Sequence, residues 1–262
     1  MQRDGIEFHY LDIGEGLPFV FQHGLTGDVT QPLDLFGALD GARLIALDCR
    51  AHGQTPIPAD AGSLNFSTFA DDVIALLDHL NLESVVIGGI SMGAGVSLNL
   101  TLRYPERVRG LILVRPAWLD EPLPRGLEAH VYAAQLMREH DGAEALHHFT
   151  TSDVYARLRD ESADTAESIL GNFEQPELAI RLERIPQDAP NHDQSEWGNI
   201  SVPALVIGCE NDFVHPFSYA LTLAEAIPYA TLQAVTAKLV DEARYTTETR
   251  GRIHNFLRPF LD

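Results

Sequence analysis

The chain has 262 residues, and its 45% hydrophobic content is enough to bury one large core without a disulfide or a metal to hold it together. Its formal net charge of −20 argues against electrostatic attraction to DNA, RNA or anionic membranes. An anionic substrate would therefore need nearby arginines to counter the general field of the protein.

Cysteine usage and the apolar runs predict the compartment. Cys49 and Cys209 are the only cysteines, and they lack the spacing of a disulfide framework, which favours a reducing environment. The polar start at Gln2–Asp4 does not resemble a signal peptide, and no apolar run approaches the ~20 residues that span a bilayer. We expect a cytoplasmic protein that binds a small molecule, and neither nucleic acid nor membrane.

Short β-rich runs alternate with helical patterns along most of the chain. Strands are predicted at Ile6–Ile13, Pro18–Gln22, Arg43–Leu47, Ser84–Ile87, Val108–Val114, Pro203–Ile207 and Thr231–Val235. Helices are predicted at Phe66–Leu80, Met92–Tyr104, Phe217–Ile227 and Thr246–Leu257. Continuous Val and Ile runs suit strands that are covered on both faces, so the pattern predicts an α/β fold with a mainly parallel sheet of about eight strands.

Residues 119–197 interrupt this alternation, because they are mostly helical or irregular and contain five prolines. An insertion after the C-terminal end of a strand lies where open α/β sheets bind ligands. We therefore predict a helical cap at 119–197, inserted into a core that is made of residues 1–118 and 198–262. Core and cap together are expected to form one structural domain.

The segment Val85–Gly95 carries the strongest functional signal, since a buried strand, a glycine-flanked serine and a helix start follow one another. Its centre is Gly-x-Ser-x-Gly, from Gly89 to Gly93. Glycines at these positions relieve crowding at a sharp turn that projects the oxygen of Ser91 above the sheet. A Walker-type phosphate loop would need a lysine where Ala94 stands, and the Gly-x-Gly-x-x-Gly dinucleotide register is absent. The motif predicts a nucleophile at Ser91.

Four further motifs resemble those of the α/β-hydrolase superfamily. They are Gln22-His23-Gly24-Leu25, Asp48-Cys49-Arg50-Ala51-His52-Gly53, Tyr104-Pro105-Glu106-Arg107-Val108 and Gly208–Pro216. The resemblance implies an α/β-hydrolase fold with the cap inserted after the family's strand 6, and it implies that Asp212 is the triad carboxylate. It also implies an oxyanion hole made by the backbone N–H groups of Leu25 and Met92, with His23 in the oxyanion loop.

The catalytic histidine that this superfamily carries between the last strand and the last helix is missing. The corresponding loop, Thr236–Tyr245, contains no histidine. Without an imidazole on its oxygen, Ser91 is a poor nucleophile, so weak activity on generic esters is expected. We expect Tyr245, immediately before the last helix, to face Ser91, and Asp212 to hydrogen-bond the tyrosine hydroxyl or a water rather than an imidazole. His215, three residues after Asp212, is the first alternative.

Arg115 and Trp118 have two interpretations each, and a pair of adjacent histidines has one. Arg115 follows the strand Val108–Val114 and either clamps a substrate carboxylate or forms a structural ion pair. Trp118 either lines the pocket mouth or packs under the cap. His147 and His148 are adjacent and point apart on a helix, and no ligand triad surrounds them, so no metal site is expected.

The sequence predicts an enzyme that hydrolyses an ester, lactone or amide of a small carbonyl compound through Ser91, without a cofactor. An anionic compound would engage Arg115. One alternative is a lyase, decarboxylase or cyclase that uses the oxyanion hole for an enolate. Another is a pocket-bearing protein that has lost turnover. These alternatives differ from a hydrolase in that Ser91 is not activated.

Overall fold

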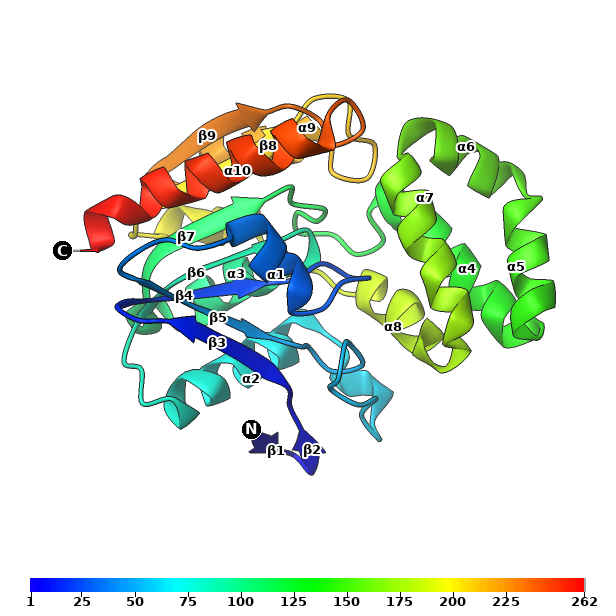
Figure 1. Cartoon of the computed structure of the whole chain (residues 1–262), viewed down its shortest axis with the longest axis horizontal. Helices are drawn as coiled ribbons and strands as arrows, with labels where there is room; N and C mark the ends of the chain where they lie inside the picture. The colour runs from blue at the N-terminus through cyan, green and yellow to red at the C-terminus, as the bar shows by residue number, and fades with distance from the viewer. Residues whose placement is uncertain (262) are drawn as a thin grey trace.

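Figure 1 shows the computed structural model of the chain, which describes residues 1–261 apart from the side chain of residue 164. In this part of the chain the main sheet has seven strands in the order β3-β5-β4-β6-β7-β8-β9. They are β3 (Tyr10–Gly14), β4 (Leu17–Gln22), β5 (Ala42–Leu47), β6 (Val85–Ile90), β7 (Val108–Val114), β8 (Ala204–Cys209) and β9 (Ala230–Val235). Only β3 pairs antiparallel with its neighbour, so the predicted mainly parallel sheet is confirmed.

The first predicted strand is divided in two. Its beginning, β2 (Ile6–Glu7), pairs with β1 (Gln2–Arg3) in a separate ribbon, and its end forms β3 in the main sheet. A tight turn at Asp4 and Gly5 closes the ribbon, and both residues have positive φ, at 52° and 75°. This left-handed turn folds the chain back on itself before β3 begins.

Helices cover both faces of the sheet. One face packs against α2 (Phe66–His79), α3 (Met92–Arg103) and α9 (Phe217–Ala226), and the other against α1 (Thr30–Phe36) and α10 (Glu242–Leu257). Each face has its own cluster of buried apolar side chains. In β6, Val85 and Ile87 belong to the cluster on the face of α2, α3 and α9, and Val86 belongs to the cluster on the face of α1 and α10. This two-sided burial explains why the strand sequences are continuous apolar runs rather than alternating ones.

The last helix begins earlier than the sequence predicts. Asp241 caps it, because its side chain accepts a hydrogen bond from the backbone N–H of Arg244, and α10 therefore starts at Glu242. The predicted start was Thr246. As a result, Tyr245 lies inside the first turn of α10 rather than on the loop before it.

The segment between β7 and β8 is helical and lies beside the carboxyl end of the sheet (Figure 1). It contains α4 (Glu128–Glu139), α5 (Gly142–Thr150), α6 (Asp153–Glu161), α7 (Ala163–Leu170) and α8 (Ala179–Arg184). Two short 3-10 helices connect α7 to α8. We call this segment the cap, and its boundaries at 119 and 197 stay a prediction. Among the described residues, no helix has the length and apolar content to cross a membrane.

Candidate active site

Ser91 lies on the sharp turn between β6 and α3, with φ of 56° and ψ of −113°. Such a backbone costs a non-glycine residue about 1–3 kcal/mol and persists only where the surroundings enforce it. A Cβ atom on Gly89 would lie 2.3 Å from the carbonyl carbon of Gly93, and one on Gly93 would lie 2.2 Å from the carbonyl oxygen of Gln22. The two glycines therefore allow strand, turn and helix to pack closely around the serine.

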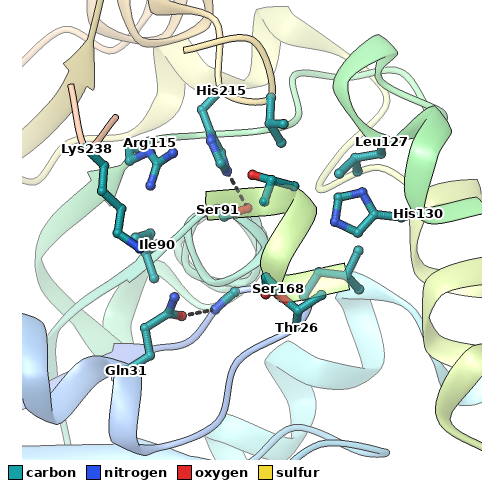
Figure 2. Close-up of a pocket in the computed structure, with 14 residues that line it drawn as sticks. Thr26, Gln31, Ile90, Ser91, Arg115, Leu127, His130, Ser168, His215 and Lys238 are labelled. Carbon is teal, nitrogen blue, oxygen red and sulfur yellow. Dashed lines mark hydrogen bonds between the residues drawn. The ribbon is translucent and has the colours of Figure 1, made fainter. Parts of the chain in front are cut away.

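His215 makes the contact with Ser91. Its Nε2 lies 3.0 Å from the serine Oγ, along the dashed line in Figure 2, and its Nδ1 lies 3.0 Å from Oδ1 of Asp212. The backbone N–H of His215 also donates to this same oxygen, at 3.1 Å. Acid and imidazole thus come from one short loop after β8, and the chain of contacts from Asp212 to Ser91 is complete.

Tyr245 does not take the position that the sequence suggested. It is buried in the first turn of α10, and its ring lies 5.5 Å from the guanidinium carbon of Arg115. Burial raises the pKa of its hydroxyl, which makes the phenol a poorer base still. The expectation that Asp212 bonds to a tyrosine or a water is wrong, because its partner is the imidazole of His215.

Arg115 forms a structural ion pair, which is one of the two roles that the sequence allows for it. Its Nε donates to Oδ2 of Asp212 at 2.6 Å, and both side chains are buried. Burial by itself would raise the pKa of Asp212, but the charges and hydrogen bonds of His215 and Arg115 outweigh it and hold this pKa well below its ordinary value. The carboxylate is therefore ionised at neutral pH and is held at both oxygens.

The two candidate oxyanion donors, the backbone N–H groups of Leu25 and Met92, belong to two segments that lie close to Ser91. Met92 is the first residue of α3, where backbone N–H groups have no acceptor within the helix and the helix dipole favours negative charge. The loop that carries Leu25 passes close to the serine, since a Cβ atom on Gly24 would lie 3.5 Å from the Cβ of Ser91. Gln31 anchors this loop by accepting a hydrogen bond from the Gly24 N–H at 2.7 Å.

Neither His23 nor Trp118 lines the pocket at Ser91, although both were candidates for it. The Nε2 of His23 accepts a hydrogen bond from the Cys49 N–H, so its Nδ1 donates to the carbonyl of Gly24 at 2.8 Å. Burial also lowers the pKa of this imidazole. Trp118 is 1% exposed and packs edge-on against Phe66. Both side chains are buried in the protein interior and do not belong to the wall of the pocket.

A cavity of about 100 Å³ opens directly over Ser91. The core contributes Leu25, Thr26 and Lys238 to its wall, and the cap contributes Leu127, His130 and Ser168. In Figure 2, His130 and Leu127 lie across the pocket from Ser91. Burial and, to a smaller extent, the nearby His215 lower the pKa of His130 to about 3, so this imidazole is neutral. Sequence reasoning missed these cap residues because no motif accompanies them.

A polar contact between core and cap bounds this cavity. The hydroxyls of Thr26 and Ser168 are hydrogen-bonded, and both residues also line a second, wider cavity of about 660 Å³. Asp28 and the buried Arg181 belong to the wall of that outer cavity. The Thr26–Ser168 contact therefore lies between the cavity at Ser91 and the wider cavity outside it.

Comparisons with known proteins agree with this architecture. Residues 18–237 match the family model described as the alpha/beta hydrolase fold. The chain is 31% identical over 231 residues to a 2-hydroxymuconate semialdehyde hydrolase of Pseudomonas putida, which covers 84% of this chain and 79% of that protein. The enol-lactonase of Burkholderia xenovorans LB400 superposes with a TM-score of 0.72 at 22% identity, over 95% of this chain and 97% of that one. A thermophilic esterase of Thermogutta terrifontis superposes with a TM-score of 0.72 at 22% identity, over 98% of this chain and 93% of the esterase. The chain belongs to the α/β-hydrolase family.

Proposed function

We propose that this protein is a serine hydrolase that cleaves an ester, lactone or amide of a small carbonyl compound through Ser91. The observation that carries the proposal is the 3.0 Å distance between the serine Oγ and Nε2 of His215. This distance is within the reach of a working general base. His215 takes the role for which the loop Thr236–Tyr245 offers no histidine, so the reason to expect weak activity no longer applies.

The proposed reaction begins with proton transfer from Ser91 to Nε2 of His215, while the serine oxygen attacks the substrate carbonyl. The N–H on Nδ1 points to Asp212, which leaves the lone pair of Nε2 for the serine proton. Because Asp212 is ionised, it stabilises the imidazolium that forms. The ion pair with Arg115 holds the carboxylate in this orientation.

The negative charge that develops on the carbonyl oxygen is stabilised by the backbone N–H groups of Leu25 and Met92. The imidazolium of His215 then gives its proton to the leaving alcohol or amine, and an acyl group stays on Ser91. Water then attacks the acyl carbon and gives a proton to the same imidazole, which passes it to the Ser91 oxygen as the bond to the acyl group breaks and the acid leaves. Nε2 of His215 thus accepts and donates the proton in every step.

The size of the inner cavity supports a small acyl group. A volume of about 100 Å³ holds only a few non-hydrogen atoms, so the remainder of a longer substrate extends past Thr26 and Ser168 into the outer cavity. The relative from Pseudomonas putida is named for hydrolysis of 2-hydroxymuconate semialdehyde, and the neighbour from Burkholderia xenovorans is an enol-lactonase. Short-chain esters and small lactones are accordingly the proposed substrate class.

Labelling with a fluorophosphonate tests serine activation directly, since the reagent reacts only with an activated nucleophile. The wild-type chain should be labelled and should hydrolyse p-nitrophenyl acetate. Ser91→Ala should abolish both, and His215→Gln should lower kcat/KM by about 10²–10⁴-fold. His192→Gln is the matched control, because the side chain of His192 is 69% exposed and lies outside the site. An unlabelled wild-type chain would favour a non-hydrolytic enzyme or a protein without turnover.

A further inference from the structure

Three side chains of potential metal ligands converge on the outer surface of the cap, at the corner between α4 and α5. Glu144 and His148 are one turn apart on α5, so they share a face of that helix. His140 ends α4, just before Asp141 caps α5. One ligand atom from each of the three lies within 4.8 Å of the other two.

The spacing within this cluster is close to that of a coordination sphere. Nδ1 of His140 lies 3.4 Å from one carboxylate oxygen of Glu144, and Nε2 of His148 lies 3.7 Å from the other. The two imidazole rings are 4.4 Å apart between centroids. Ligand atoms about 2.0–2.2 Å from a tetrahedral zinc ion are about 3.3–3.6 Å from one another, so small side-chain rotations bring these three groups into position.

We propose that His140, Glu144 and His148 bind a divalent transition-metal ion, Zn²⁺ in the first place, with water as the fourth ligand. Two imidazoles and one carboxylate form a ligand set that zinc takes in proteins. The side chains are 27%, 56% and 44% exposed, so an ion in solution reaches them without any opening of the fold.

The proposed site differs from the adjacent pair His147 and His148, for which the sequence predicts no metal site. The partner of His148 is His140 from the preceding helix end, whereas the ring of His147 is 6.1 Å away and outside the cluster. The ligands are spread over nine residues and meet only because the chain turns between α4 and α5. Adjacency in the sequence therefore gives no indication of this cluster.

A bound ion would join the end of α4 to α5. The same two helices already pack through the rings of Tyr132 and Phe149, and α4 carries His130 in the wall of the reaction cavity. Because the ion would bind the folded cap and not the unfolded chain, it should stabilise the protein by mass action. The role that we assign to it is to fix this corner of the cap.

Isothermal titration calorimetry with ZnCl₂ tests the proposal. The protein is the full chain without a histidine tag, and a chelator is used to remove bound metal before the titration. We expect one ion per chain, and Glu144→Gln and His148→Gln should each weaken the affinity by at least about tenfold. His147→Gln is the matched control and should bind as the wild type does. Co²⁺ should bind to the same site with the intense visible absorption of tetrahedral coordination, and the spectrum should be lost in His148→Gln.

Two outcomes would overturn the site. One is the absence of zinc binding by the wild-type chain. The other is equal affinity in the wild type, Glu144→Gln and His148→Gln, which would place the ion elsewhere. Circular dichroism checks that each variant keeps the helix content of the wild type, and the three side chains are 27–56% exposed, so we expect the variants to fold. Esterase activity is measured separately and does not decide this question.

Discussion

The core and the cap hold their functional residues in different ways. In the core, Ser91 is fixed by backbone packing, and Asp212 is held at both carboxylate oxygens. In the cap, His130 and Ser168 extend from helices that meet the core through separate polar contacts, such as the bond between Thr26 and Ser168. In the function that we propose, the core therefore carries out the reaction, whereas the cap determines which molecules reach it.

Asp212→Asn should have the largest effect, because it removes the charge that stabilises the imidazolium and presents His215 with an amide. We expect kcat/KM for p-nitrophenyl acetate to fall by about 10³–10⁴-fold. Asp160→Asn is the control in the cap, where 73% of the aspartate side chain is exposed. A variant at Asp212 that keeps more than about a tenth of the activity would show that the core pair does not control the chemistry.

Gly93→Ala should have the largest effect on stability. The new Cβ would lie 2.2 Å from the carbonyl oxygen of Gln22, which belongs to the backbone and has little freedom to move. We expect a loss of about 3 kcal/mol in the free energy of unfolding by urea, together with loss of fluorophosphonate labelling.

Gly251→Ala is the matched control for this substitution. Gly251 lies within α10, and a Cβ atom there has nothing within 4 Å, so alanine should stabilise the protein by about 0.5–1 kcal/mol. The same chemical change should thus have opposite signs at the two positions. Equal effects at both would mean that close packing is not what requires glycine in the serine turn.

The buried His130 should make stability depend on pH. Its pKa is about 3 in the folded protein, against an ordinary value of 6.5, so between these values the unfolded chain binds the additional proton. Stability therefore falls as the pH is lowered through this window. Between about pH 6.5 and pH 4.5, His130→Gln should lose about 2 kcal/mol less than the wild type.

Urea unfolding of both proteins across this pH range measures that difference. Other buried histidines, His23 and His52 among them, also have lowered pKa values, but they contribute equally to the two proteins. Parallel stability curves for wild type and His130→Gln would contradict the account, and would mean that the cap wall opens to water on acidification.

Ser168→Ala should have the smallest effect, since it removes one hydrogen bond between cap and core. Such a bond contributes about 1 kcal/mol, so passage between the two cavities should become easier by up to about fivefold. We expect kcat/KM to rise for p-nitrophenyl hexanoate relative to the acetate. Thr150→Ala, which removes a cap hydroxyl bonded within its own helix, should leave the ratio unchanged.

The sequence by itself determined the sheet, the helix pattern and the position of Ser91. These follow from short stretches of chain, because alternating strand and helix signals and the glycines around Ser91 reflect local backbone requirements. Val85, Val86 and Ile87 indicated a strand covered on both faces, and the two apolar clusters confirm it. Local pattern and global fold agree there.

Only the tertiary structure decided which side chain meets Ser91. His215 was visible in the sequence three residues after Asp212, but nothing local showed that its loop, rather than the loop before α10, reaches across to β6. The position predicted for Tyr245 is wrong because Asp241, the N-cap residue of α10, starts this helix earlier than predicted. Tyr245 therefore lies within the first turn of α10 and is buried. His130 lies 39 positions from Ser91 and is brought to it by the docking of the cap helices. Contacts of this kind depend on how whole elements pack, and that information is spread over the chain rather than held in any one motif.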